Sequence, residues 1–369
     1  MAQLGIYVHV PFCRKKCGYC DFFSVCTLKS AEDYASAVLR DMERFRERGQ
    51  SADTLYFGGG TPTELPADLL RRLVSSAREI FSIDNSAEIT VETNPGETVP
   101  GLFEGLRRCG VNRLSVGMQS ACENELEFLG RGHSPEQASE TVGLAKAEGF
   151  QNISLDLMLG IPFQTRESLK RSVDFAASLG VSHVSAYILK VEEGTRFALL
   201  QKKGELPLCD EDFCAESYLY ACELLEQYGF MQYEISNFSK PGFESRHNLK
   251  YWRDEEYLGF GPSAHSFFEG KRFFYKRNLA EYIKGAAPVF DGDGGGAEEY
   301  IMLGLRLCEG LDLEKFEQKF GFPFKKTSLA VAKELALHGL VAFDGKKIAL
   351  TRHGFLLSNE IIWRQTHPI

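Results

Sequence analysis

Apolar residues follow two alternating patterns over the first half of the chain. Short runs rich in β-branched and aromatic residues predict strands, and the stretches between them carry the three-to-four-residue apolar spacing of amphipathic helices. The predicted strands are 6–10, 54–57, 88–92, 113–116, 153–158 and 183–189, and the helices include 30–49, 66–81, 100–109 and 166–179. Six strands separated by helices predict a parallel sheet with right-handed crossovers.

This alternation stops after residue 190. Residues 210–228 predict a helix, residues 232–235 predict one more strand, and a polar and aromatic stretch follows. The glycine-rich run 291–296 predicts a flexible linker. Beyond it, helical patterns lead to a predicted hairpin around Asp344 and Gly345, which suggests a small winged-helix-like domain. We therefore expect domains at 1–190, 191–290 and 297–369.

Composition narrows the class of protein. The 369 residues exceed what one compact core usually holds, and hydrophobic residues make up 44% of them. Lys and Arg number 42 against 51 Asp and Glu, and the resulting net charge of -9 disfavours binding along a nucleic-acid backbone. The sequence shows neither a signal-peptide pattern nor a membrane-spanning apolar run. We expect a cytoplasmic protein without a transmembrane segment.

The ten cysteines fall into two groups. Seven are scattered, mostly among apolar residues, and we expect buried thiols there, because a chain that is not secreted rarely builds a disulfide framework. These seven are Cys26, Cys109, Cys122, Cys209, Cys214, Cys222 and Cys308. The other three, Cys13, Cys17 and Cys20, form a C-x3-C-x2-C pattern directly after the first predicted strand.

Three thiolates on one loop can converge on a single metal centre. A structural zinc ion usually takes four protein ligands, and Cys26 is the one nearby candidate for the fourth. A four-iron cluster can be held by three cysteines, which leaves one iron open to a small ligand. The pattern favours an iron–sulfur cluster over zinc or unligated thiols.

The C-x3-C-x2-C pattern, with Tyr19 before its last cysteine, resembles the radical S-adenosylmethionine (SAM) superfamily. This resemblance implies a partial (β/α)6 barrel and a [4Fe-4S] cluster held by Cys13, Cys17 and Cys20. In that superfamily the open iron binds the amino and carboxylate groups of SAM, and reduction then releases a 5'-deoxyadenosyl radical.

A narrower resemblance, to the oxygen-independent coproporphyrinogen oxidase group, covers nearly the whole chain. The matching segments are 7–13, 58–63 (GGGTPT), 92–95 (ETNP), 115–120 (SVGMQS), 129–133 (LGRGH), 156–162 and 258–266. The resemblance implies a SAM pocket lined by Tyr7, Tyr19, Gly59, Gly60, Thr61, Glu92, Gln119, Arg131 and Asp156.

Each of these positions also has a physical interpretation. The triple glycine lets a backbone approach a ligand closely or simply makes a tight turn, and it lacks the lysine of a phosphate-binding P-loop. Glu92 can accept hydrogen bonds from a ribose or an ammonium group, or it is a surface carboxylate. Gln119, Arg131 and Asp156 lie at or near strand ends. In a parallel sheet those ends share one rim, where ligands bind.

Two subfamilies compete for the function. The decarboxylating oxidases carry a fourth cysteine two residues after the third, where this chain has Phe22, and they extend further ahead of the first strand. In both respects the chain resembles the HemW-type heme chaperones instead. Residues 247–252 (HNLKYW) match the H-N-x-x-Y-W pattern of those chaperones. This resemblance implies that heme is bound, with His247 as the candidate iron ligand, because imidazole commonly ligates heme iron.

The function we expect is therefore heme delivery to client apo-hemoproteins such as respiratory enzymes. The alternative is a coproporphyrinogen III oxidase-type radical SAM enzyme. In the family the C-terminal domain is thought to cover the barrel opening, and nucleic acid is not an expected partner. The sequence leaves open the client, whether SAM is cleaved, any membrane-surface association, and the choice between monomer and homodimer.

Overall fold

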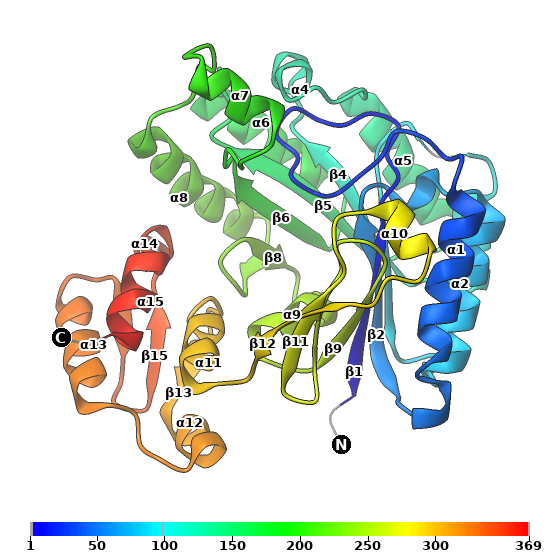
Figure 1. Ribbon diagram of the computed structural model, residues 1–369. Helices are drawn as coiled ribbons and strands as arrows, with labels where there is room; N and C mark the ends of the chain where they lie inside the picture. Colours follow the sequence, from blue (N-terminus) through cyan, green and yellow to red (C-terminus); the bar gives the residue numbers. More distant parts are fainter. Residues whose placement is uncertain (1–2, 98, 368–369) are drawn as a thin grey trace.

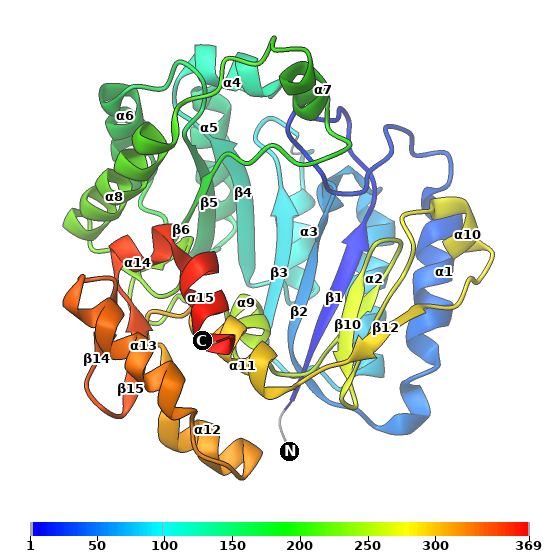
Figure 2. The ribbon, with the colours of Figure 1, turned by 60° about the vertical axis from the view of Figure 1, so that its left-hand side comes forward.

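The computed structural model describes residues 3–97 and 99–367, and its first six strands form the parallel part of one large sheet. They are β1 (Leu4–Val10), β2 (Ala52–Gly59), β3 (Glu88–Thr93), β4 (Arg113–Gln119), β5 (Asn152–Leu159) and β6 (His183–Ile188). Each strand is paired in parallel with the next one along the chain. The predicted partial (β/α)6 barrel is confirmed, and its carboxyl ends share one edge (Figures 1 and 2).

Helices cover the outer face of this sheet (Figure 2). They are α1 (Ala31–Glu43), α2 (Ala67–Ile80), α3 (Leu102–Arg108), α4 (Glu123–Leu129), α5 (Pro135–Ala147) and α6 (Arg166–Ser178). The apolar stripe of α2, with Leu70, Leu73, Val74 and Ala77 three to four residues apart, is buried. The amphipathic spacing in the sequence therefore marks the side of each helix that faces the sheet.

Strict alternation along the strands gives the barrel a polar interior. In β4, Leu114 and Val116 join the apolar core, whereas Arg113 and Ser115 are buried polar residues between them. The same alternation recurs in β3, β5 and β6. Because successive side chains of a strand point to opposite faces, the apolar set packs under the helices and the polar set faces inward.

The sheet continues beyond the barrel on both sides. Its order is β12-β11-β10-β9-β1-β2-β3-β4-β5-β6-β8-β7. The added elements are α7 (Arg196–Lys202), α8 (Glu211–Gln227), β7 (Met231–Gln232), β8 (Asn237–Ser239), α9 (Arg246–Trp252), β9 (Tyr257–Phe260), β10 (His265–Phe268), β11 (Lys271–Phe274), α10 (Leu279–Ile283) and β12 (Val289–Asp293). Strand β9 runs parallel to β1, and β8 runs antiparallel to β6.

Two local predictions are wrong. The single strand expected at 232–235 is instead a pair of short antiparallel strands, β7 and β8, joined by a tight turn. The linker expected at 291–296 begins inside β12, which pairs with β11. Gly292 and Gly295 take positive φ angles there, so the glycines shape a bulged strand end and a turn.

The C-terminal domain is the expected helical unit with a hairpin. It consists of α11 (Ala297–Gly304), β13 (Leu311–Asp312), α12 (Leu313–Phe320), α13 (Lys326–Leu337), β14 (Val341–Phe343), β15 (Lys347–Leu350), α14 (Arg352–Leu356) and α15 (Ser358–Thr366). Strand β13 adds to the predicted hairpin as a third strand. Lys319 reaches the buried carboxylate of Asp254 at 2.8 Å, which ties this domain to the segment after α9.

Two findings concern the predicted environment of the chain. Within residues 3–97 and 99–367, no helix combines the length and apolar character needed to cross a membrane. The expectation that the scattered cysteines are buried is wrong for most of them: Cys122 and Cys222 are buried, Cys26 is exposed, and the other four are intermediate. Apolar neighbours in sequence do not reveal whether a thiol reaches the core, because alternate positions face opposite sides of an element.

Candidate cofactor site at the carboxyl end of the barrel

The loop that follows β1 lies across the carboxyl end of the barrel (Figures 1 and 2). It carries Cys13, Cys17 and Cys20 and returns to its own base at Val25. The backbone N–H of Cys13 donates to the Val25 carbonyl at 3.1 Å, and the N–H of Val25 donates to the Pro11 carbonyl at 2.7 Å. The loop is therefore closed at its neck, and the three cysteines are held on one short excursion.

The end of β2 fixes this loop through its glycines. The N–H groups of Gly60 and Thr61 donate to the carbonyls of Val10 and Phe12, at 2.8 and 2.6 Å. A Cβ atom on Gly60 would lie 2.5 Å from the Phe12 carbonyl oxygen, so no side chain fits there. Gly60, the last of the three glycines, therefore serves a close approach between two backbone segments of the protein itself.

The three thiols are free and have polar partners. The Sγ of Cys13 lies 3.5 Å from the Thr61 hydroxyl, and Nη1 of Arg131 donates to the Sγ of Cys17 at 3.5 Å. Burial raises the pKa of Cys13 to about 11 and also raises the pKa of Cys20. Among the described residues, however, no group of three or more His, Cys, Asp or Glu side chains is already arranged to hold a metal ion.

The donor chemistry nevertheless fits a thiolate-bound cluster. None of the three cysteines is fully buried or paired in a disulfide, and all three belong to the same closed loop. Arg131 supplies a positive charge beside Cys17, and its Nε is a buried donor without a hydrogen-bond acceptor in the protein. A buried donor without a partner is costly and indicates that a further acceptor belongs at this point.

Arg131 contacts several polar groups on this rim. Its Nη2 donates to the Asn94 side-chain oxygen at 3.1 Å and to the Gly117 carbonyl. The Asn94 amide donates in turn to the Thr61 hydroxyl at 2.8 Å. Asn94 therefore joins two predicted site residues, and the sequence prediction missed it, although it directly follows β3 in the quoted ETNP segment.

Glu92 is the carboxylate of the site whose pKa lies close to neutral pH. Tyr56 donates to its Oε1 at 2.7 Å, and the Gly59 N–H donates to its Oε2 at 3.2 Å. Burial raises the pKa of Glu92 to about 7, opposed by these two hydrogen bonds. Near neutral pH this group can therefore either accept or donate a hydrogen bond to a ligand.

Three more of the predicted residues, Asp156, Gln119 and Tyr19, lie at the same end. Asp156 lies 3.4 Å from the Ser115 hydroxyl, and burial raises its pKa. Gln119 has a positive φ of 67°, a strained backbone for a residue with a side chain, at a bulge that ends β4. Tyr19 packs against Phe197, and the charges of Arg131, Cys17 and Asp156 all act on it. Tyr7 lies deeper, with its hydroxyl 3.3 Å from Nδ1 of His9.

His247 lies at the other end of the barrel. Its side chain packs against the first residues of β1 and β2: its Nδ1 is 2.8 Å from the Thr54 hydroxyl, and its Nε2 is 2.8 Å from the Tyr251 hydroxyl. The residue is 1% exposed. Burial, helped by the charges of Lys250 and Arg113, lowers the pKa of His247 to about 3. The structure does not bring His247 together with the cysteine loop.

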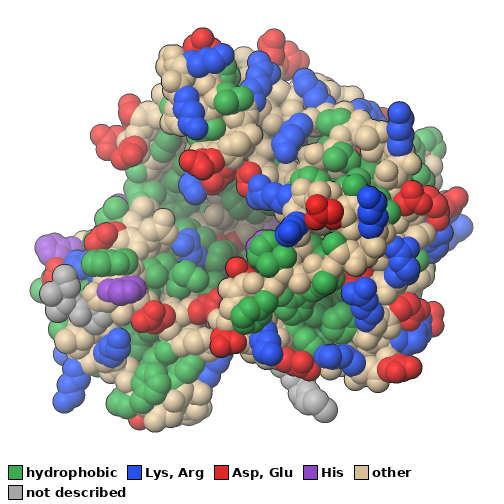
Figure 3. Space-filling view, in the orientation of Figure 1, with side chains coloured by type: hydrophobic (Ala, Val, Ile, Leu, Met, Phe, Trp, Pro, Cys, Tyr) green, Lys and Arg blue, Asp and Glu red, His purple; other side chains and the backbone are tan. Residues whose placement is uncertain are grey.

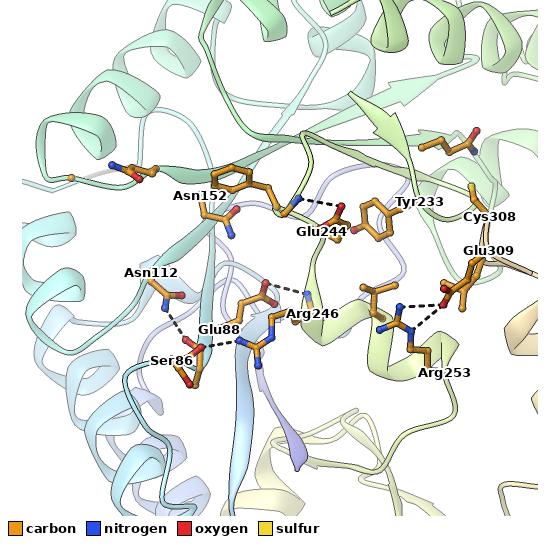
Figure 4. Close-up of a pocket in the computed structure, with 18 of the residues that line it drawn as sticks. Ser86, Glu88, Asn112, Asn152, Tyr233, Glu244, Arg246, Arg253, Cys308 and Glu309 are labelled. Carbon is orange, nitrogen blue, oxygen red and sulfur yellow. Dashed lines mark hydrogen bonds and ion pairs between the residues drawn. The ribbon is translucent and has the colours of Figure 1, made fainter. Parts of the chain in front are cut away.

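A large cleft also lies at this opposite end. Its volume is about 980 Å³, and none of the predicted cofactor residues line it. Figure 4 shows that charged residues of its wall are in contact: Glu88 accepts a hydrogen bond from the backbone N–H of Arg246 at 3.1 Å, and Arg253 forms an ion pair with Glu309 at 3.1 Å. The cleft therefore marks the junction between the barrel and the C-terminal domain.

Comparisons with known proteins match both parts of the chain. A model of the Radical SAM superfamily matches residues 7–176, and a model of the HemN C-terminal domain matches residues 297–357. The heme chaperone HemW of Bacillus subtilis is 37% identical, over 96% of this chain and 97% of the relative. The chain belongs to the HemW family. The HemW of Lactococcus lactis is 36% identical over 96% of this chain and 95% of the relative.

A solved structure shows the same fold at full length. Coproporphyrinogen III oxidase (HemN) from Escherichia coli, described as a radical SAM enzyme, matches with a TM-score of 0.86 and 26% identity. The match covers 100% of this chain and 91% of that chain. Membership of the superfamily implies a [4Fe-4S] cluster and SAM as cofactors, which agrees with the free thiols and the polar rim described above.

The glycine contact generates a first prediction. Gly60→Ala places a methyl group against the Phe12 and Val10 carbonyls, so we expect a loss of about 1–3 kcal/mol in the free energy of unfolding. We also expect reduced iron uptake. Gly132→Ala is the matched control, because nothing lies within 4 Å of a Cβ there. Denaturant unfolding and iron analysis measure both effects, and equal behaviour of the two variants would contradict the role of Gly60.

The enclosed His247 generates a second prediction. In the unfolded chain a histidine takes up a proton near pH 6.5, whereas native His247 stays neutral down to about pH 3. Its contribution to stability is therefore full above pH 6.5 and is lost as the pH falls below it, by up to about 1.4 kcal/mol per unit. His247→Gln removes this loss, so the stability gap between this variant and the unmodified protein should narrow from pH 6.5 to 4.5.

Tyr251→Phe is the control for the pH effect. It removes one hydrogen bond of His247 and retains the titrating ring, so its stability gap should vary much less with pH over this range. Denaturant unfolding at several pH values measures both gaps. A His247→Gln gap that stays constant with pH would show that the native histidine titrates normally.

Proposed function

We propose that this chain is a heme chaperone, which binds heme and delivers it to apo-hemoproteins. The observation that carries this proposal is the 37% identity with a heme chaperone over 96% of the chain. One structural detail supports it: Phe22, at the position of the oxidases' fourth cysteine, has a side chain that is 64% exposed at the cysteine loop. The ten cysteines form no disulfide, which supports action in the cytoplasm.

Cys13, Cys17 and Cys20 are the proposed ligands of the [4Fe-4S] cluster. When bound, the cluster and SAM supply one-electron chemistry at the sulfonium. The residues of this chain supply the binding: Arg131 balances the charge at Cys17, and Thr61 contacts Cys13. The proposed SAM pocket comprises Tyr7, Tyr19, Gly59, Gly60, Thr61, Glu92, Gln119, Arg131 and Asp156.

His247 is the proposed ligand of heme iron. Its imidazole is neutral, which is the form that binds a metal, but both ring nitrogens have protein partners. Ligation therefore requires α9 to move away from the barrel. Lys250 holds the helix against the barrel through Asp53 at 2.8 Å and the Gln3 carbonyl at 2.8 Å.

The second candidate function is a coproporphyrinogen III oxidase. The observation that favours it is the full-length structural match with HemN. Phe22 argues against it, as does the closer similarity to the heme chaperones.

Cys17→Ala tests the cluster. After anaerobic reconstitution, we expect this variant to lose most of its iron and visible absorbance, because two thiolates cannot hold the cluster. Cys26→Ala is the matched control: Cys26 is an exposed cysteine close to the same loop, and its loss should leave the iron content unchanged. Unchanged iron in Cys17→Ala would contradict the assignment. Zinc that is lost with either cysteine would instead indicate a four-ligand zinc site.

His247→Ala tests the heme ligand. We expect it to weaken heme binding and to shift the absorption spectrum of the complex, because imidazole ligation is lost. Tyr251→Phe removes the partner of Nε2, so heme should bind this variant at least as fast as it binds the unmodified protein. A heme spectrum unaltered by His247→Ala would exclude His247 as the ligand. Transfer of heme from the protein to an apo-acceptor, followed by the acceptor's spectrum, tests delivery itself.

A further inference from the structure

Helix α9 lies between the barrel and the C-terminal domain (Figures 1 and 2). It packs against β2 on one side and against α11 on the other. Its barrel side is buried, because His247 and Lys250 are only 1% and 5% exposed. The helix therefore closes the amino end of the barrel over His247, and a ligand of that imidazole has to displace it.

The barrel holds α9 at its first turn and at its middle. Glu88, at the start of β3, accepts hydrogen bonds from the backbone N–H groups of Arg246 and His247, at 3.1 and 3.0 Å. Its carboxylate thereby satisfies two of the N–H groups that the first turn of a helix leaves unpaired. In the middle of the helix, Lys250 adds its ion pair with Asp53 at 2.8 Å.

The C-terminal domain holds the other end of α9. The guanidinium of Arg306 lies 5.9 Å from the ring centroid of Trp252, the last residue of the helix. Arg253, which follows, forms its ion pair with Glu309. Both side chains of this pair are about half exposed, so the pair stabilises little.

The ion pair between Asp254 and Lys319 is the best protected contact at this end. The Asp254 carboxylate is 0% exposed, and Nζ of Lys319, on α12, lies 2.8 Å from its Oδ2. The second cation, Arg272, is 3.6 Å from Oδ1, which is too far for a hydrogen bond. A buried carboxylate that loses its closest cation has no compensation for its lost hydration. Separation of α12 from Asp254 is therefore unfavourable.

Asp254 also ends the helix. Its φ is 54°, in the left-handed region where Asp and Asn are tolerated better than other residues that carry a Cβ. The N–H of Glu255 donates back to the Lys250 carbonyl at 2.9 Å, which closes the last turn of α9. The carboxylate that Lys319 contacts therefore belongs to the residue that fixes the end of α9.

The side of α9 that faces away from the barrel has room for movement. Arg246 and Leu249 of the helix, with Arg253 directly after it, line the 980 Å³ cleft described above. Figure 3 shows the C-terminal domain as a lobe at lower left, set off from the rest of the molecule by a hollow. Once its end is released, α9 can swing toward the cleft and uncover His247 while the sheet stays intact.

We propose that α9 is a lid over the amino end of the barrel and that the C-terminal domain holds it closed through the Asp254–Lys319 ion pair, which we call the latch. This inference rests on the proposed function, because the group under the lid is the proposed heme ligand. Heme binds only the open state, so its association rate follows the fraction of molecules whose latch is released.

Hydrogen exchange of the full-length protein, free of heme, tests the latch. The test variant is Lys319→Gln, which removes the charge and keeps a long polar side chain. We expect the exchange rates of the α9 amides to rise by roughly fivefold or more, whereas the amides of β4 keep their rates. Lys315→Gln is the matched control, because Lys315 is an exposed lysine of the same helix and pairs with no carboxylate among the described residues.

Asp254→Asn releases the latch from its other side. Asn tolerates the same left-handed backbone, so this variant removes the charge and keeps the end of the helix. We expect it to raise the exchange rates of α9 as Lys319→Gln does.

Stopped-flow measurement of hemin association connects the latch with the heme site. Lys319→Gln should bind hemin faster, by about the factor by which exchange of α9 rises. The gain should be absent when His247→Ala is added, because the uncovered group is then missing. Lys315→Gln should bind hemin at the rate of the unmodified protein.

The outcomes separate the latch from the proposed function. Exchange of α9 that stays at the level of Lys315→Gln in either test variant overturns the latch and leaves the proposed function standing. An equal rise in β4 shows a general loss of stability and also overturns the latch. Faster exchange without faster hemin association overturns the control of heme access. An unmodified protein that binds no hemin overturns the proposed function, and the exchange rates still decide on the latch.

Discussion

The cofactor end of this molecule depends on one backbone contact, in which Gly60 and Thr61 at the end of β2 donate to the carbonyls of Val10 and Phe12. This contact fixes the point at which the cysteine loop leaves the barrel, and it places the Thr61 hydroxyl beside Cys13. Because it is made by backbone atoms, it is indifferent to most side chains, but position 60 cannot carry a Cβ. The requirement for glycine follows from packing within the protein, before any ligand is considered.

From that contact a chain of hydrogen bonds continues around the rim. Thr61 contacts Asn94, Asn94 contacts Arg131, and Arg131 contacts Cys17. The polar interior then connects the two ends of the barrel. Tyr56 donates to Glu92 at the cofactor end, and its ring stacks on His247 at the other end, with centroids 5.2 Å apart. Tyr56 therefore contacts both the Glu92 carboxylate and the proposed heme ligand, although His247 and the cysteine loop do not touch.

Much of this arrangement follows from the sequence, because alternation along the strands and apolar spacing in the helices are local properties. Arg131 and Thr61 could be assigned to one rim, since parallel strands present their carboxyl ends together. The enclosure of His247 could not be predicted, because the pattern does not tell which face of α9 meets the barrel. Similarly, the residues around Gly292 have the composition of a linker. They form a strand because β11, which lies about 20 residues earlier, offers an edge with which they pair.

We propose that the chain carries heme and does not decarboxylate coproporphyrinogen. The most direct test is anaerobic: the reconstituted protein receives SAM, a reductant and coproporphyrinogen III, and the formation of protoporphyrinogen is followed. A parallel sample loaded with heme is mixed with an apo-hemoprotein. We predict no protoporphyrinogen and a transfer of heme to the acceptor. Turnover of coproporphyrinogen would contradict it and would make the chain an oxidase despite Phe22.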